Sequence, residues 1–385
     1  MSERIIQLSA EHFEPLITFL DLVFGEHHPH EFRHLLPAVY GPSEEQMRCN
    51  YAIMRDGRIV ANVGLFPIDL QVAGISLKVA GIGGVSVHPE TRGQGLMCQL
   101  MDFILAEIHR QHFQLSYLGG HRQRYGYWGW ERGGSELQFE VDAGNIRHSS
   151  VDTDHCQIRL HEISDDHETI EALHSLHDCQ VIYCRRPAEI FYRFLLGWGR
   201  RPLVARGLDD SVLGYFTTSH DSERITEIVA TSDDMAVAIM RDWVRRQNRR
   251  LQFVLAPGTA LLARRLGQFA STAYVAESGN WQIFDWPGVV NALLKVHHAQ
   301  HDLPRGVVVI RIDDADVVLR LIVDDDGASC RPTDLAPDWT SDAGTALRVL
   351  FGPLDPLDVV ALPTAAVALR SWCPLPLGLS YLDHV

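Results

Sequence analysis

Apolar and polar positions along residues 1–145 alternate in a pattern that predicts strands and helices in turn. Strand-like runs occupy residues 4–8, 50–54, 58–67, 75–87, 115–118 and 136–141, with turns at Asp56-Gly57 and Gly74. Apolar residues at helical spacing predict helices over residues 10–24 and 96–109. The order and lengths of these elements predict a mixed sheet, with a parallel pair of strands around the second helix.

A similar order of elements recurs after the polar residues 147–154, which we expect to form a linker. The pattern predicts strands at 157–161, 203–206, 211–219, 224–230 and 251–256, and helices at 165–177, 187–196 and 234–247. This region is therefore expected to be a second copy of the first fold. Its segment Ser232-Asp233-Asp234-Met235 holds two carboxylates and no glycine. Because these carboxylates would repel a phosphate group, we expect the second copy to be catalytically empty.

From about residue 287 the pattern predicts a small α+β module. Helices at 289–297 and 340–351 flank a hairpin formed by residues 307–312 and 317–323, and proline-rich segments follow. The whole chain is thus predicted to be mixed α/β (α+β), with tandem mixed sheets flanked by helices and a smaller α+β domain. A chain of 385 residues is longer than one hydrophobic core usually serves, so we expect domains at 1–146, 147–286 and 287–385.

Composition narrows the class of protein. The net charge of −15 argues against a nucleic-acid partner and is compatible with a cationic substrate. The seven cysteines are scattered without a Cys-x-x-Cys pair, which is typical of reduced thiols in a cytoplasm. No run of 18 apolar residues occurs, and the first residues do not resemble a secretory signal. We therefore expect a cytoplasmic protein without a membrane partner.

The most informative segment is Val85-Ser86-Val87-His88-Pro89-Glu90-Thr91-Arg92-Gly93-Gln94-Gly95-Leu96, a strand, a bend and a glycine-interrupted turn that opens a helix. The first amides of such a helix have no intrahelical partner and, with the helix dipole, form an anion site. The two glycines let a pyrophosphate approach the backbone, and Arg92 adds a charged donor. The alternative is a plain strand-to-helix turn. Met97 stands where such turns usually carry Gly or Ala, and we expect its side chain to face the helix packing.

Other clusters favour less specific interpretations. His27, His28, His30 and His34, like the group His297, His298 and His301, have no cysteine or paired acid at metal-site spacing. We expect solvated histidines and no metal. The segment Gly81-Ile82-Gly83-Gly84 hints at a dinucleotide fingerprint, but a strand follows it instead of a helix. Gly83 and Gly84 are expected to form a bulge or to permit a close approach of coenzyme or substrate.

The phosphate-binding pattern, the empty second copy and the C-terminal module together resemble the enhanced-intracellular-survival type of GNAT acetyltransferase. The segment Leu118-Gly119-Gly120-His121-Arg122-Gln123-Arg124-Tyr125-Gly126-Tyr127-Trp128-Gly129-Trp130 is similar to the family's Tyr-Gly-x-Phe-Gly-aromatic element. The resemblance covers essentially the whole length. It implies two GNAT-like domains and a sterol-carrier-protein-like C-terminal domain, which we expect to be a scaffold. It also makes a homo-oligomeric ring, a hexamer, plausible.

The resemblance implies acetyl-CoA as co-substrate and direct transfer of its acetyl group to a primary amine in a ternary complex. The acceptor would be aminoglycoside-like, a polyamine or a lysine side chain. The expected cofactor-binding residues are Val85, Ser86, Val87, Arg92, Gly93, Gln94, Gly95, Leu96, Gly119 and Gly120. A non-enzymatic coenzyme A sensor or a lipid- or protein-binding scaffold is the alternative function, and transfer of a longer acyl chain is a third.

Acetyl transfer to an amine needs a group that takes the ammonium proton and one that protonates the leaving thiolate. Tyr125 follows the glycine-rich turn and matches the family's catalytic tyrosine, so we expect it to be the general acid. Its alternative role is that of one more aromatic in a packed cluster. The resemblance implies that the terminal carboxylate, here that of Val385, accepts the ammonium proton. A solvated chain end is the alternative.

Overall fold

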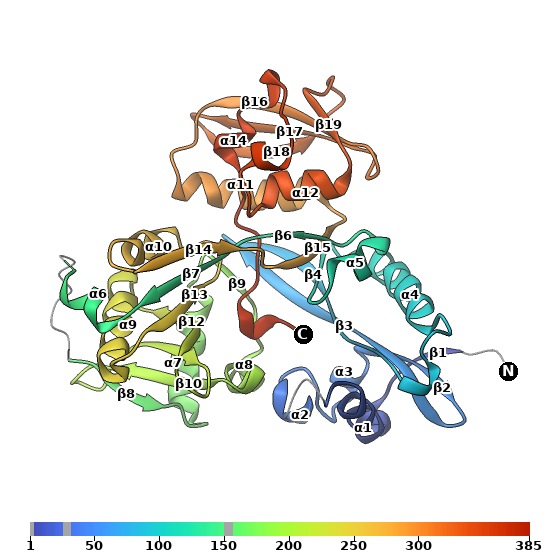
Figure 1. Cartoon of the computed structure of the whole chain (residues 1–385), viewed down its shortest axis with the longest axis horizontal. Coiled ribbons are helices and arrows are strands. Elements are labelled where there is room, and N and C mark those ends of the chain that lie inside the picture. The colour runs from blue at the N-terminus through green and yellow to red at the C-terminus, as the bar shows by residue number, and fades with distance from the viewer. Residues whose placement is uncertain (1–3, 26–31, 150–156) are drawn as a thin grey trace.

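The strands of the computed structural model pair into three sheets, and Figure 1 shows each sheet with helices of its own. The structure describes residues 4–25, 32–149 and 157–385. Most of the predicted linker, together with His27, His28 and His30, lies outside these ranges. The predicted mixed α/β architecture of several sheets flanked by helices is confirmed.

The first sheet combines a run of antiparallel strands with one parallel pair. Its strands, in spatial order, are β1 (Ile5–Gln7), β2 (Asn50–Arg55), β3 (Arg58–Val72), β4 (Ile75–Val87), β5 (Leu115–Leu118), β15 (Gly279–Ile283) and β6 (Glu131–Gly133), and β9 (Ile182–Cys184) pairs with the end of β3. The pair β4 and β5 is parallel, as predicted, and the other neighbours are antiparallel. Helix α4 (Leu96–Arg110) connects the parallel strands.

The second sheet repeats this order of strand directions. Its strands, in spatial order, are β8 (Arg159–Glu162), β10 (Arg201–Arg206), β11 (Val212–Thr218), β12 (Arg224–Ala230), β13 (Leu251–Leu255), β7 (Glu136–Val141) and β14 (Thr272–Ala276). Again one pair, β12 and β13, is parallel and the other neighbours are antiparallel. Helix α9 (Asp233–Gln247) connects this pair, and the remaining helices are α6 (Ala143–Arg147), α7 (His167–Asp178), α8 (Phe191–Leu195) and α10 (Ala260–Gly267).

The sixth place of each sheet is filled by a strand from the other half of the chain. We expected residues 136–141 to close the first sheet, but β7 pairs with β13 and β14 in the second. In return β15 pairs with β5 and β6 of the first sheet. The alternating pattern of β7 specifies a half-buried strand but not its neighbours, so this correction comes from tertiary pairing. The exchange ties the two sheets together.

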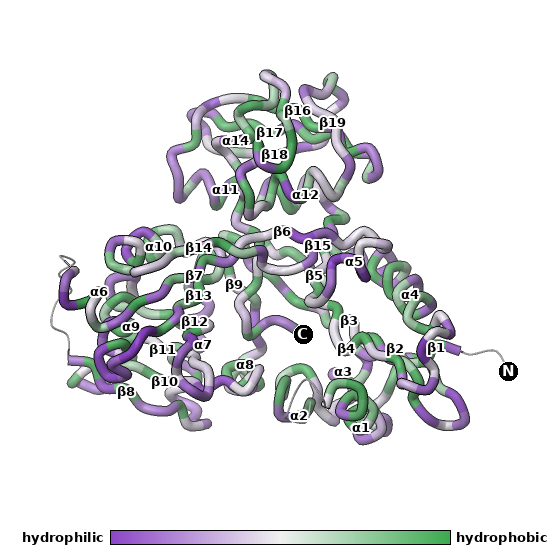
Figure 2. Tube along the Cα trace, viewed as in Figure 1, coloured by the Kyte–Doolittle hydropathy of each residue, from purple (hydrophilic) through white to green (hydrophobic). Residues whose placement is uncertain are grey.

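The C-terminal module contains a four-stranded sheet in the order β18 (Gly327–Pro332), β17 (Val317–Asp324), β16 (Gly306–Ile312) and β19 (Trp339–Ser341). The predicted hairpin is confirmed as β16 and β17. Residues 339–341 form a strand rather than the start of a helix, and α12 (Ala343–Phe351) begins after the Asp342 cap. The other helices are α11 (Trp286–Gln300), α13 (Pro356–Val359) and α14 (Leu369–Trp372). Figure 2 shows that β17 and β3 are largely apolar, and the module's core is continuous with that of the first sheet.

The N-terminal helices cover the lower part of the first sheet in Figure 1. They are α1 (Phe13–Phe24), α2 (Phe32–Leu35) and α3 (Glu44–Met47), and their apolar faces form one cluster with Phe66 of β3. A short 3-10 turn, Ala10–His12, replaces the first turn of the helix predicted at 10–24. The last residues leave the C-terminal module and run between the two larger sheets, where the chain end lies (Figure 1).

Candidate functional site

The predicted anion site has the backbone geometry that a phosphate cradle requires. After β4 and the 3-10 turn Pro89–Thr91, Gly93 has φ of 79° and Gly95, the N-cap of α4, has φ of 76°. Both values lie in the left-handed region that favours glycine. Gly95 offers no side-chain cap, and the first turn of α4 carries no acidic residue. The amides at this helix start are therefore uncapped, and they lie at the positive end of the helix dipole.

A groove of about 640 Å³ opens at this helix start. Seven of the ten predicted cofactor residues line it: Val85, Ser86, Val87, Arg92, Gly93, Gly95 and Leu96. A Cβ added to Gly93 or Gly95 would meet no atom within 4 Å, so both glycines border free space. We call this space the cofactor groove.

The other three predicted residues do not line the groove. Gln94 turns to Arg55, whose Nη2 donates to its Oε1 at 3.0 Å. The carbonyl of Gly120 accepts a hydrogen bond of 3.0 Å from Asn280 Nδ2, and the ring of Tyr125 lies against its Cα. Gly119 adjoins this turn at the end of β5. These two glycines shape the turn that leads to Tyr125.

The groove also has walls that the motif did not reveal. They are Val23 and Phe24 at the end of α1, Thr91, Met97, His121 and Arg124. Met97 both packs against the core of the first sheet and borders the groove, so it faces the helix packing only in part. Arg124 directly precedes Tyr125 in the sequence, and this position was the one signal that could have indicated Arg124 as a groove residue. Phe24 comes from an element distant in sequence from the motif, so nothing local indicated it.

The strands β4 and β5 part at the centre of the site. Their pairing ends at Ile82 and Leu118, while β4 continues to Val87. A β-bulge interrupts the pairing of β4 with β3 between Gly83 and Ser86, where Gly84 has φ of 57°. The predicted bulge is thus confirmed. Beyond Ile82, β4 presents backbone that β5 does not pair.

Tyr125 lies in α5 (Arg122–Tyr125) and is 6% exposed, packed in the cluster that includes Leu118 and Trp130. Burial raises the pKa of Tyr125 above its ordinary value, and a hydrogen bond and the charge of Arg124 oppose this increase. The phenol is therefore protonated at neutral pH. Its packing also fits the alternative role of a core aromatic, and Arg124 connects it to the cofactor groove.

The carboxyl group of Val385 lies against β4. A Cβ placed on Gly83 would stand 2.7 Å from the Val385 carboxyl carbon, and one on Gly81 would stand 2.9 Å from its Cγ2. The group that approaches Gly83 closely is the chain's own Val385, and the expected approach of coenzyme or substrate stays a prediction. The indole Nε1 of Trp198 donates to the His384 carbonyl at 3.2 Å, and the His384 and Tyr117 rings lie 4.8 Å apart.

Val385 borders a second cavity of about 890 Å³ between the two larger sheets. Carboxylates on its wall come from Glu45, Asp69, Asp178 and Glu189. Two exposed arginines, Arg185 and Arg193, also line it, together with the buried Arg186 and Asp383, and Arg185 Nη1 lies 3.5 Å from Asp69 Oδ2. We call this space the interunit cavity; its exposed charges are predominantly negative.

The equivalent turn of the second sheet has different chemistry. The Ser232 hydroxyl accepts a hydrogen bond of 3.1 Å from Met235 N, so a side chain already occupies the start of α9. Burial and the neighbouring Asp234 raise the pKa of Asp233. This capped, acidic helix start agrees with the expectation that the second unit holds no phosphate.

Within residues 4–25, 32–149 and 157–385, no group of three or more His, Cys, Asp or Glu side chains is arranged to hold a metal ion. None of the helices in the described part of the chain has the length and apolar character needed to span a membrane. The His297 and His301 rings lie 4.3 Å apart, and burial lowers the pKa of His297 to about 4.

Comparison with known proteins identifies the first unit. Residues 4–133 match a family described as an acetyltransferase (GNAT) domain. A search of curated protein sequences gave no significant match. The matched segment contains β4, the glycine turn and the start of α4, which build the cofactor groove, and it also contains Tyr125.

Solved structures share the fold along nearly the whole chain. Eis1 from Mycobacterium abscessus is 18% identical with a TM-score of 0.65, covering 98% of this chain and 99% of its own. A GCN5-related N-acetyltransferase from Anabaena variabilis is 17% identical with a TM-score of 0.66, covering 98% of both chains. Another from Kribbella flavida is 17% identical with a TM-score of 0.63, covering 100% of this chain and 98% of its own. The chain therefore carries a GNAT acetyltransferase domain at residues 4–133, which confirms the prediction of a GNAT-type enzyme.

Proposed function

We propose that this protein transfers the acetyl group of acetyl-CoA to a primary amine of a cationic acceptor, by direct transfer in a ternary complex. One observation carries the proposal. The bulge of β4 adjoins both spaces: Val85 lines the cofactor groove, and Gly83 contacts Val385, which lines the interunit cavity. Two residues of strand span only about 7 Å. A thioester in the groove and an amine in the cavity would thus be within reach of each other.

The groove supports the binding of acetyl-CoA in an extended form. The Gly93 and Gly95 turn would hold the pyrophosphate on the amides of α4, and Arg92 would add a charged donor. The backbone at Val85 and Val87, on the side where β5 no longer pairs with β4, would hydrogen-bond the pantetheine arm. The acetyl group would then lie where β4 and β5 part. When bound, acetyl-CoA supplies the activated acetyl group as a thioester.

The interunit cavity supports a cationic acceptor. Carboxylates of Glu45, Asp69, Asp178 and Glu189 outnumber the arginines on its wall, and the Val385 carboxyl group adds to them. Such a surface favours an ammonium over a neutral or anionic group. An aminoglycoside-like molecule, a polyamine and a lysine side chain share this chemistry, and all three remain within the proposal.

Two groups would handle the protons, provided that the chain ends at Val385. The Val385 carboxylate accepts a proton from the acceptor ammonium, which frees the lone pair of the nitrogen. The amine nitrogen attacks the thioester carbon, the carbon–sulfur bond breaks, and Tyr125 protonates the departing thiolate. The second nitrogen proton leaves to solvent as the amide forms. Tyr125 recovers its proton from solvent, and the protonated Val385 carboxyl group releases its proton to solvent.

The test is release of free coenzyme A from acetyl-CoA in a thiol assay with a panel of amines. We expect release with di- and polyamines and little release with uncharged amines. Calorimetric binding without thiol release would instead support the coenzyme A sensor. A preference for propionyl-CoA or larger donors would support the longer-chain transferase. A two-residue extension after Val385 should abolish transfer, and full activity of the extended protein would remove Val385 from the mechanism.

The remaining expectations stay predictions. The three domains at 1–146, 147–286 and 287–385, the sterol-carrier-like character of the last, the ring-shaped homo-oligomer and the cytoplasmic location belong to this proposal. The absence of nucleic-acid and membrane partners also belongs to it.

A further inference from the structure

A fully buried ionic cluster lies between the two larger sheets and the last residues of the chain. Arg186 is 1% exposed and makes two hydrogen bonds to Glu227, from Nη1 at 2.9 Å and from Nη2 at 2.7 Å. It also makes two to Asp383, from Nε at 2.8 Å and from Nη2 at 3.0 Å. Glu227 and Asp383 are 7% and 3% exposed. We call these three residues the arginine clamp.

The clamp joins three separate parts of the fold. Arg186 follows β9, which pairs with β3 of the first sheet, and the Arg185 amide donates to the Asp69 carbonyl at 2.8 Å. Glu227 belongs to β12 of the second sheet. Asp383 belongs to the short 3-10 turn Tyr381–Asp383 near the chain end. One guanidinium therefore holds the C-terminal segment to both sheets.

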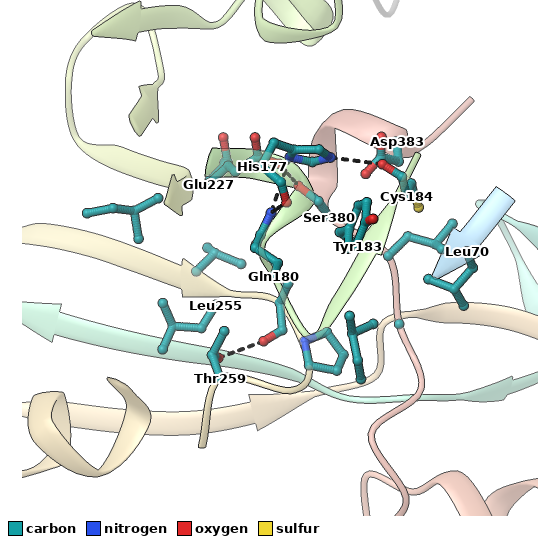
Figure 3. Close-up of a pocket in the computed structure, with 18 residues that line it drawn as sticks. Leu70, His177, Gln180, Tyr183, Cys184, Glu227, Leu255, Thr259, Ser380 and Asp383 are labelled. Carbon is teal, nitrogen blue, oxygen red and sulfur yellow. Dashed lines mark hydrogen bonds between the residues drawn. The ribbon is translucent and has the colours of Figure 1, made fainter. Parts of the chain in front are cut away.

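Neighbouring groups make further hydrogen bonds to the residues of the clamp. The Ser380 hydroxyl and the Tyr215 hydroxyl both donate to Glu227, the latter at 3.0 Å. The His174 imidazole contacts the Arg186 carbonyl at 2.8 Å. Figure 3 shows Glu227, Ser380 and Asp383 grouped with His177 at one side of a small buried cavity. Buried charges persist only when they are paired and hydrogen-bonded, and these are.

A buried ion pair is weak evidence for a role in stability, because apolar residues of similar volume often serve as well. What a buried arginine–carboxylate pair does contribute is a fixed geometry, because the planar guanidinium binds carboxylates in a defined orientation. Asp383 lies two residues before Val385, whose carboxyl group must reach Gly83. A clamp on Asp383 thus restricts Val385 to a small volume. The proposed proton transfer needs that restriction, because a misplacement of 1 Å can cost about 100-fold in rate.

We propose that Arg186 is a positioning residue: held by Glu227, it fixes Asp383 and thereby sets the Val385 carboxyl group at the bulge of β4. This inference rests on the proposed function of Val385. It also assigns a task to the second unit, whose helix α9 begins with a side-chain cap and an acidic first turn instead of an open glycine turn. That unit supplies the rigid strand, β12, from which the catalytic end of the chain is held.

The test is Asp383→Asn, which keeps the side-chain volume and leaves the Arg186–Glu227 pair intact. We expect kcat to fall by about 10- to 100-fold while KM for acetyl-CoA changes by less than about twofold. Hydrogen exchange at residues 381–385 should accelerate, because the segment loses its charged anchor. Asp358→Asn, a change of the same kind at an exposed site on α13, should alter neither quantity.

Each outcome separates this inference from the proposal on which it rests. A folded Asp383→Asn protein with wild-type kcat, or with unchanged hydrogen exchange at 381–385, overturns the positioning role alone. Wild-type protein that transfers no acetyl group to any amine overturns both. If Asp383→Asn fails to fold, the neutral triple variant Arg186→Met, Glu227→Gln, Asp383→Asn leaves no unpaired buried charge. It should show the same loss of kcat at unchanged KM, and wild-type kcat in that variant would contradict the inference.

Discussion

Gly83 leaves the space in which the carboxyl group of Val385 lies. A Cβ there would approach the Val385 carboxyl carbon to 2.7 Å and its oxygen to 3.0 Å. Gly83 lies within β4 and its φ is not positive. Its backbone conformation therefore does not require glycine, and the missing side chain matters because it leaves room for Val385. Gly83 and Val385 thus pack against each other although about 300 positions separate them in the sequence.

Gly83→Ala should therefore displace the carboxyl group of Val385. We expect kcat to fall by about 10- to 100-fold with little change in acetyl-CoA affinity, because the cradle at Gly93 and Gly95 is untouched. Steady-state thiol release and calorimetry measure the two quantities. Gly267→Ala is the matched control, since a Cβ there meets no atom within 4 Å. Wild-type kcat in Gly83→Ala would show that the position of Val385 does not matter.

Tyr125→Phe should lower turnover by about tenfold or more and leave coenzyme affinity nearly unchanged, because it removes only the proton donor. Because burial raises the pKa of Tyr125, the wild-type rate should not decline from deprotonation of this phenol below about pH 10. Thiol release measured between pH 6 and 10 checks both statements. Tyr127→Phe is the control, since Tyr127 is 89% exposed. Equal turnover of Tyr125→Phe and wild type would leave Tyr125 as a packing residue.

Arg92→Ala should weaken acetyl-CoA binding without changing the fold. The side chain is exposed, so solvent screens its interaction, and we expect a loss of about 3- to 10-fold in affinity. The loss should shrink at high salt, because screening weakens the attraction to phosphate. Calorimetry at two salt concentrations measures it. Arg110→Ala, at the opposite end of α4, should bind like wild type; an equal loss in both variants would contradict a specific phosphate contact.

The parts of the site that the sequence predicts are those built from neighbouring residues. The turn at Gly93 and Gly95, the start of α4 and the parallel pairing of β4 with β5 depend on short-range geometry and on one crossover helix. That information is contained within about 40 residues of chain. Seven of the ten expected cofactor residues accordingly line the groove.

The parts that the sequence does not reveal depend on contacts between distant segments. Arg186 lies 41 positions from Glu227 and 197 from Asp383, and each of the three residues alone resembles an ordinary surface charge. The exchange of β7 and β15 is equally invisible in the sequence. The alternation of apolar and polar residues along a strand indicates which face is buried, but it does not indicate which strand is the neighbour. Phe24 reaches the groove from a helix whose pattern indicates only a packing face.

His177 should make the stability of the protein depend on pH below neutrality. It is 1% exposed, and burial, followed by the charge of Arg186, lowers its pKa to about 4. Its Nε2 lies 2.8 Å from the Cys184 carbonyl, which can only accept, so the neutral ring carries its proton on Nε2. The folded state therefore holds an uncharged imidazole at neutral pH.

The sign of the effect follows from which state binds the proton. The unfolded chain has the ordinary pKa near 6.5, so between pH 6.5 and 4 it gains a proton that the folded state does not. The free energy of unfolding should then fall with acidification, by up to about 3 kcal/mol from this group across that interval. Urea unfolding at several pH values measures the slope. His177→Gln should flatten it, whereas His167→Gln, at an exposed site on α7, should not; equal slopes in His177→Gln and wild type would exclude this histidine as the cause.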